Sequence, residues 1–179
     1  NSDGGDQARL VQVVEGGDSG WRIGYQYQDE PSSRRGPWNA EKMWQPHFLG
    51  QPTFIVPPVA YISDGPSGIS YYPGTGWNKN YAGRFFLVDF KGQNTISGVH
   101  SFTLKPRGAS FEIVNPEKTI WGVLAVDAQF GPDGAFYIAD WVQGWRMPGK
   151  GRVYRVFDPV GIKAPETLAT RRIIAEGMG

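Results

Sequence analysis

The chain has 179 residues, of which 40% are hydrophobic, so it is long enough for one domain with a buried core. Its 18 basic and 17 acidic side chains give a net charge of +1, which provides no strong field for nucleic acid or an anionic membrane. The sequence has no run of about 18 apolar residues, so we predict no membrane span. The absence of cysteine excludes disulfides, thiolate metal sites and covalently attached haem within these residues.

Short strand-like runs separated by turn residues recur along the chain and favour an all-β fold. They cover residues 10–14, 21–27, 85–90, 99–104, 110–114, 135–140 and 152–157. Residues 28–58 are rich in proline and tryptophan and predict a long loop over one face of the sheets, because each proline removes a ladder donor. An ordinary insertion is the alternative. Residues 165–176 predict a helix, with proline in its first turn and apolar residues at helical spacing.

An internal repeat indicates how these strands are organised. Residues 64–72 (DGPSGISYY) are echoed by residues 130–138 (FGPDGAFYI), and a Gly-Arg strand follows each copy. A propeller blade needs roughly 40 to 50 residues. We therefore predict an incomplete β-propeller over residues 1–160, with about two whole four-stranded antiparallel blades and parts of their neighbours. Residues 161–179 would form a linker and the start of a helical region, and the chain would be a fragment of a longer protein.

Three segments, in this order, resemble the soluble quinoprotein glucose/sorbosone dehydrogenase family. Residues 4–21 resemble its Gly-Gly-Asp-Glu loop and Gly-Trp turn, residues 65–91 its Pro-Ser-Gly blade with a final lysine, and residues 127–134 its last Gly-Pro-Asp-Gly blade. The sequence motifs are more similar still to those of the multidomain "membrane-bound dehydrogenase" proteins of planctomycetes and verrucomicrobia. This similarity includes residues 139–142 (ADWV) and 149–155 (GKGRVYR). The resemblance implies a periplasmic or extracellular sugar or alcohol oxidoreductase whose parent protein passes electrons to a haem domain.

The resemblance implies that Lys91 contacts the acidic quinone PQQ, where an ammonium group would neutralise a carboxylate or a quinone oxygen. A solvated lysine in a β-turn is the alternative. The family also presents arginines in the strand before Gly-Pro-Asp-Gly, but residues 124–128 of this chain read Leu-Ala-Val-Asp-Ala. Each lost charge-assisted hydrogen bond is worth roughly 1.5 to 3 kcal/mol, which argues against retained PQQ binding. The family's catalytic histidine lies in a half that this chain lacks, so no catalytic residue is assigned.

The glycine-rich start of the chain offers a second candidate site. Asp3, Asp6 and Asp18 supply oxygen ligands of the kind that Ca²⁺ prefers, and the relatives implied by the resemblance bind calcium near this loop. Ordinary turn chemistry is the alternative. His47 and His100 are too far apart for an HxxxH metal motif, and we interpret both as structural.

The remaining acidic and aromatic residues have both structural and functional interpretations. We expect four aspartates to cap turns and join blades: Asp89, Asp127, Asp133 and Asp140. The seven tryptophans could stack on sugars, although packing between blades is the commoner role.

Two functional hypotheses follow from these observations. In one, the chain is part of a quinoprotein dehydrogenase and forms one side of its cofactor site. In the other, it is a non-catalytic propeller that binds glycans or another subunit. Because propellers host unrelated functions, the fold does not decide between them. Under either hypothesis we expect the remainder of the parent propeller, or another protein chain, to cover the apolar flank that an incomplete ring exposes.

Overall fold

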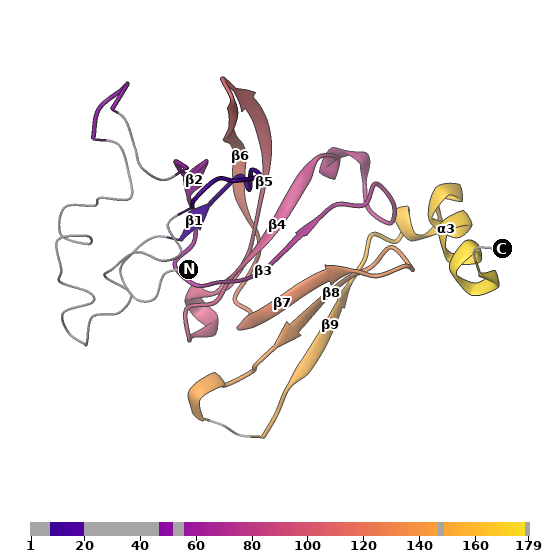
Figure 1. Ribbon diagram of the computed structural model, residues 1–179. Helices are drawn as coiled ribbons and strands as arrows, with labels where there is room; N and C mark the ends of the chain where they lie inside the picture. The colour runs from indigo at the N-terminus through magenta and orange to yellow at the C-terminus, as the bar shows by residue number, and fades with distance from the viewer. Residues whose placement is uncertain (1–7, 20–46, 52–55, 147–148, 178–179) are drawn as a thin grey trace.

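The computed structural model describes residues 8–19, 47–51, 56–146 and 149–177 (Figure 1). Nine strands and one α-helix form within them, in the order β1 (Arg9–Leu10), β2 (Ala60–Tyr61), β3 (Pro66–Tyr71), β4 (Arg84–Asp89), β5 (Gly98–Arg107), β6 (Ser110–Trp121), β7 (Ala125–Phe130), β8 (Phe136–Asp140), β9 (Arg152–Val156) and α3 (Pro165–Glu176). Short 3-10 turns are η2 (Lys79–Tyr81), η3 (Asn94–Ile96), η4 (Gly144–Arg146) and η5 (Gly161–Lys163). None of the helices in these ranges is long and apolar enough to cross a membrane.

The strands make antiparallel sheets whose order follows the chain. One sheet has the order β3-β4-β5-β6, the second β7-β8-β9, and the third is the pair β1-β2. The four-stranded and three-stranded sheets pack face to face, with β3 and β4 against β7 (Figure 1). This arrangement confirms an all-β, incomplete propeller with a short C-terminal helix. The described residues complete one four-stranded sheet; the strand predicted for residues 21–27 and most of the loop predicted for residues 28–58 lie outside them.

The burial of each strand follows from its neighbours. In β8, Phe136, Ile138 and Asp140 are buried and the two residues between them are less so, as expected for a strand with one covered face. In β4, the four consecutive residues from Phe86 to Asp89 are buried, because this strand is central in its sheet and covered on both faces. Continuous burial and alternating burial therefore mark two different places in the same fold, although both strands are rich in apolar residues.

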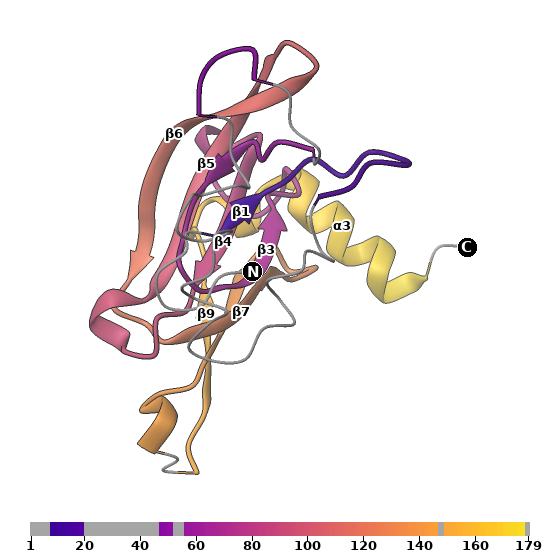
Figure 2. The ribbon, with the colours of Figure 1, turned by 60° about the vertical axis from the view of Figure 1, so that its left-hand side comes forward.

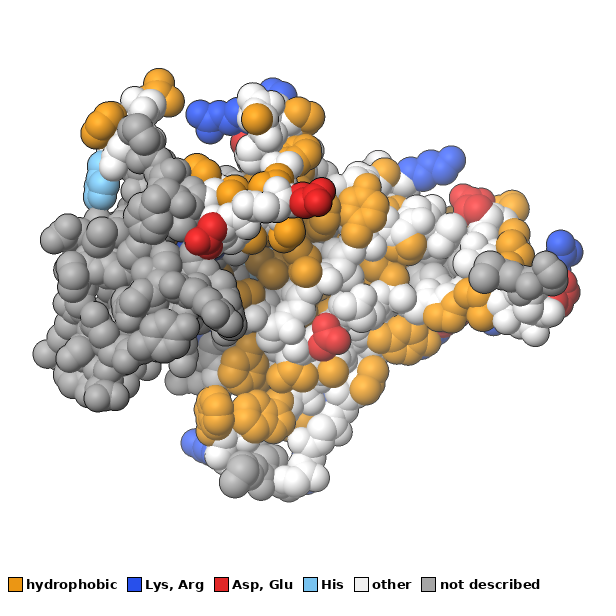
Figure 3. Space-filling view, viewed as in Figure 1, with side chains coloured by type: hydrophobic (Ala, Val, Ile, Leu, Met, Phe, Trp, Pro, Cys, Tyr) orange, Lys and Arg blue, Asp and Glu red, His pale blue; other side chains and the backbone are white. Residues whose placement is uncertain are grey.

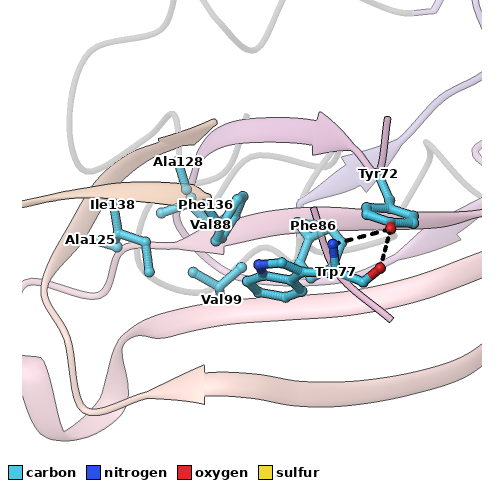
Figure 4. Close-up of a cluster of buried hydrophobic side chains, with 9 residues drawn as sticks. All are labelled: Tyr72, Trp77, Phe86, Val88, Val99, Ala125, Ala128, Phe136 and Ile138. Atoms are coloured by element: carbon cyan, nitrogen blue, oxygen red, sulfur yellow. Dashed lines mark hydrogen bonds between the residues drawn. The ribbon is translucent and has the colours of Figure 1, made fainter. Parts of the chain in front are cut away.

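The core between the two larger sheets is aromatic (Figure 4). The Trp77 ring lies edge-to-face against Phe86, Phe130 and Phe136, with centroids 5.4 to 5.7 Å apart. The Tyr72 hydroxyl donates to the Trp77 carbonyl at 2.6 Å and accepts from the Trp77 N–H at 3.3 Å. These contacts fix the angle between the sheets and thus the position of the loops that leave them.

The helix α3 is attached to the sheets through one buried hydroxyl. Thr167 Oγ1 donates to the Gly161 carbonyl at 2.8 Å and accepts from the Gly76 N–H at 2.9 Å. At this crossing the backbones of Gly76 and Gly134 touch, and a Cβ on either glycine would overlap the other residue. The predicted helix bounds of 165–176 are confirmed, and the far half of α3 projects from the body (Figure 2).

The two copies of the repeat occupy different places in their sheets. The first copy begins β3, which is the end strand of the four-stranded sheet. The second copy forms the turn between β7 and β8, closed by a hydrogen bond from the Gly134 N–H to the Gly131 carbonyl at 3.0 Å. In the first copy Pro66 to Gly68 already belong to the strand, whereas in the second copy the motif is the turn before one. Gly-Pro-x-Gly therefore does not mark equivalent positions in two blades.

Candidate functional site

Two neighbouring features lie where β4 leaves its sheet. The first, which we call the Asp89 cluster, is a group of polar side chains: Ser63, Asp64, Asp89, Lys91 and His100. The second, which we call the Trp145 hollow, is a surface depression of about 560 Å³ lined by Gly92, Gln93, Asn94, Thr95, Leu124, Val142, Gln143, Trp145 and Arg146. They adjoin because Gly92 follows Lys91 directly in the chain.

The Asp89 carboxylate is the centre of the cluster, and only 1% of this side chain is exposed. Its Oδ1 accepts from Ser63 Oγ at 2.7 Å and from the backbone N–H groups of Asp64 and Gly65 at 3.2 and 3.1 Å. Its Oδ2 lies 3.1 Å from His100 Nε2. Burial alone would raise the pKa of Asp89, but the hydrogen bonds from His100, Ser63 and the backbone outweigh it and hold the pKa well below the usual range. Asp89 is therefore an ionised acceptor, and the hydrogen in this contact belongs to His100 Nε2.

The Lys91 ammonium group is held by two carboxylates. Its Nζ lies 2.5 Å from Asp64 Oδ2 and 3.5 Å from Asp89 Oδ2. The hydrogen bond to Asp64 raises the pKa of Lys91, against an opposing effect of burial, and the side chain keeps 29% of its surface exposed. Its backbone N–H donates to Ser97 Oγ at 2.9 Å. Lys91 is therefore a member of an ion-pair network, which neither sequence interpretation anticipated.

The positions where the resemblance calls for arginines are apolar in space as well as in sequence. Leu124 is fully buried and forms one wall of the Trp145 hollow. Val126 lies on β7 and lines a separate depression on the outer face of the β7–β9 sheet. No guanidinium group can approach Lys91 from either position.

Of the three aspartates predicted to bind calcium, the structure describes one. Asp3 and Asp6 lie outside the described residues, whereas Asp18 lies within them and its carbonyl accepts from the Val56 N–H at 2.6 Å. Across the described ranges there is no group of three or more His, Asp or Glu side chains placed to hold a metal ion. The calcium site stays a prediction.

Hydrogen bonds or ring contacts within the chain engage the other residues that the sequence singled out, where they are described. His47 is exposed, and its backbone N–H donates to Gln51 Oε1 at 2.7 Å, while the His100 ring lies edge-to-face against Trp121. Asp133 accepts from the Ala135 N–H at 3.2 Å and pairs with Arg155. Asp140 likewise accepts from the Val142 N–H at 2.9 Å and from Arg152 Nε at 2.8 Å. Asp127 accepts from the Ala128 N–H at 2.8 Å.

The Trp145 hollow has an aromatic side. Trp145 is 71% exposed, although its ring packs edge-to-face with that of Trp141, with centroids 4.9 Å apart. Phe90 stacks on Trp141 at 5.8 Å and meets Trp145 at 6.3 Å. Apolar side chains gather on the surface around the β8–β9 connection (Figure 3). Sequence reasoning did not separate Trp145 from the other tryptophans, because its exposure depends on how the β8–β9 loop packs.

Comparison with known proteins finds partial similarity to solved structures at low sequence identity. No family model and no curated protein sequence matches this chain. Similar solved structures include a protein described as an oxidoreductase (glucose dehydrogenase) from Thermus thermophilus, with 20% identity, a TM-score of 0.43 and coverage of 62% of this chain and 32% of that chain. Two further glucose dehydrogenase structures are 18% identical, with TM-scores of 0.41 and 0.43, and cover 59% and 64% of this chain. The chain spans about a third of the length of each, and similarity at this level assigns no residue a role.

Proposed function

We propose that this chain is a non-catalytic part of a dehydrogenase-like propeller, with a binding and scaffolding role and no redox centre of its own. The observation that carries the proposal is the pairing of the Lys91 ammonium group with Asp64 and Asp89. The cation that would have to meet an anionic cofactor is already neutralised by carboxylates of the same chain.

Electrostatics argue against PQQ at this position. The Asp89 cluster contains two carboxylates and one ammonium group, so its charge is −1 before His100 is counted. A negative unit charge 4 Å from a carboxylate is repelled by about 4 kcal/mol at an effective dielectric constant of 20. Leu124 supplies no compensating guanidinium group, and the guanidinium group of the adjoining hollow, that of Arg146, belongs to an exposed residue. The residues present therefore do not fit an acidic quinone, and we derive no step through one.

The scaffolding role rests on the open face of the β7–β9 sheet. A shallow depression of about 740 Å³ on this face is lined by residues that include Val126, Ala139 and Val153. Among the described strands, β9 is hydrogen-bonded to β8 alone. Such a face and edge need a cover, and another sheet of the parent propeller or of a second chain has the matching shape.

A substitution on that face tests the scaffolding role. We expect Val153→Lys to weaken assembly of the parent protein or of its complex, as measured by light scattering after size-exclusion chromatography. Val160→Lys, at an exposed apolar residue outside the sheets, is the control and should leave assembly unchanged. Unchanged assembly of the Val153→Lys protein would contradict a covered sheet face.

The oxidoreductase role is the second candidate, and the partial exposure of Lys91 favours it. In that case the parent protein would be a periplasmic or extracellular sugar or alcohol dehydrogenase with a haem domain. Ca²⁺ would be held near Asp3, Asp6 and Asp18, and PQQ would have to displace Asp64 from Lys91.

Titration of the intact protein with PQQ separates the two candidates. Calorimetry and a dye-reduction assay with glucose and simple alcohols would compare the wild type with Lys91→Ala, in the presence of Ca²⁺. We expect no PQQ-dependent turnover that depends on Lys91. Lys105→Ala, at an exposed lysine on β5, is the matched control. Saturable turnover that Lys91→Ala abolishes and Lys105→Ala preserves would overturn the proposal.

A further inference from the structure

Within the described residues, the Trp145 hollow brings together polar and aromatic side chains that are open to solvent. Its polar lining residues Gln93, Asn94 and Gln143 are exposed, in contrast to the buried Asp89. Its volume of about 560 Å³ falls within the range of roughly 300 to 1,000 Å³ found for small-molecule sites.

The Trp145 ring is held in place although it is exposed. Trp141 and Phe90 each meet the indole in an edge-to-face arrangement, and 71% of Trp145 stays exposed. The loop before it contains Val142 at a φ of 59°, a conformation that β-branched residues rarely adopt. The Val142 N–H donates to Asp140, and Arg152 holds the other oxygen of that carboxylate. The loop therefore presents a large apolar surface in a fixed position, at a conformational cost that the body of the sheet offsets.

The chemistry of the lining narrows the class of ligand. Side-chain amides and the Thr95 hydroxyl both donate and accept hydrogen bonds, whereas no carboxylate among the described residues lines the hollow to attract a metal ion. A ligand that suits this lining has an apolar face for the indole and groups that both donate and accept around its edge. A pyranose ring has both, with C–H groups on its face and hydroxyls around its edge.

We propose that the Trp145 hollow is a binding subsite for a pyranose sugar, with Trp145 as the stacking platform and Gln93 and Gln143 as hydrogen-bonding partners. The inference rests on the binding role proposed above and gives it a location and a ligand class. Arg146 is the charged residue of the lining, and it offers a bidentate partner for the carboxylate of an acidic sugar.

The test is a titration of the intact protein with maltotriose, cellotriose and trigalacturonate, followed by tryptophan fluorescence and calorimetry. We expect at least one of these oligosaccharides to bind saturably and to shift the emission. Trp145→Ala should weaken the binding roughly tenfold, which corresponds to about 1.4 kcal/mol, because it removes the stacking surface. Trp145→Phe should retain most of the affinity because it keeps an aromatic face. Arg146→Gln should weaken only trigalacturonate.

Controls separate a lost site from a misfolded protein. Phe157→Ala removes another exposed aromatic ring, at the far end of β9, and should leave sugar binding unchanged. Near-ultraviolet circular dichroism would verify the fold of each variant, and Gln143→Ala provides a milder second test of the hollow. The inference is overturned if none of the three oligosaccharides binds, or if binding survives Trp145→Ala unchanged. Failure here with no PQQ binding would leave the non-redox function standing, whereas Lys91-dependent PQQ turnover would overturn that function and leave the sugar result intact.

Discussion

The Asp89 cluster and the Trp145 hollow adjoin at the end of β4, yet the polar groups of the cluster are paired with one another and those of the hollow are exposed. In the cluster, Asp89 has partners at both oxygens and Lys91 is paired with two carboxylates. In the hollow, exposed amides surround an exposed indole. A ligand of the cluster would have to break ion pairs and hydrogen bonds, whereas a ligand of the hollow would meet side chains that are already exposed. The charged residues of the cluster are thus engaged with one another, whereas the amides, the indole and Arg146 of the neighbouring loop are exposed.

Asp89→Ala should produce the largest effect and would define the cluster as a structural unit. The substitution leaves Ser63, His100 and two backbone N–H groups without their acceptor. We expect a loss of about 3 to 5 kcal/mol in the free energy of unfolding, as for other broken buried charge networks. Denaturant titration measures it. Asp127→Ala is the control, because Asp127 is exposed and accepts from the adjacent Ala128 N–H, so its cost should be below about 1 kcal/mol.

Lowering the pH should weaken the same network in the unsubstituted protein, which would appear as a decline in the free energy of unfolding. The pKa of Asp89 is lower in the folded than in the unfolded state, where it is about 3.9. The unfolded state therefore binds the proton first, and the stabilisation is complete above about pH 5 and declines as the pH falls further. Denaturation curves from pH 6 to pH 2 should show this decline in the wild type. Asp89→Asn should flatten the part that Asp89 contributes, and an identical decline in both proteins would refute the assignment.

Gly92→Ala acts at the junction between the two regions. Gly92 has a φ of 75°, and a Cβ there would lie 3.0 Å from Trp145 Nε1. We expect a loss of about 1 to 2 kcal/mol from the left-handed backbone together with a displaced indole and weaker sugar binding. Gly108→Ala is matched in backbone, with a φ of 59° and open space around the new methyl group. It should cost similar stability and leave sugar binding unchanged; weaker binding in both variants would uncouple Gly92 from the hollow.

Lys91→Gln should give the smallest effect and would distinguish the outer from the inner part of the cluster. Lys91 and Asp64 are both partly exposed, so solvent screens their attraction and the cost should be below about 1 kcal/mol. The difference from the wild type should shrink as salt is added, because screening weakens exposed pairs. Measurement at low and high salt checks this. A cost comparable to that of Asp89→Ala would mean that Lys91, and not the backbone donors, holds the carboxylate.

The parts of the fold that local patterns determine were predictable from the sequence. The helix over residues 165–176 has its proline at the first turn and ends before Gly177, and its bounds agree with the structure. The strand-like runs match β4, β5, β8 and β9 closely, but β6 continues to Trp121 and β1 is confined to Arg9–Leu10. They omit β2, β3 and β7. In β3, Pro66 and Gly68 are poor strand formers that are tolerated at the end of a sheet.

The sites depend on pairings that a single sequence does not display. The Asp89–His100 contact arises from the register in which Leu87 faces His100 and Asp89 faces Gly98. The sequence singled out Lys91 as a candidate site residue. It did not show the partner Asp64, which comes from the segment before β3 and is brought near Lys91 by folding. The exposure of Trp145 depends on a loop held in an uncommon conformation.

The crossing beneath α3 has a consequence for how this sequence can evolve. Gly76, Gly134 and Gly161 come from three separate segments, and a Cβ on any of them would overlap the backbone of a neighbour. A substitution there cannot be compensated by trimming another side chain, because backbone atoms stand in the way. We therefore expect these three glycines, together with Thr167, to be substituted more rarely in homologues than other residues of the chain. A distant homologue whose loops have diverged beyond alignment would still be recognisable by them.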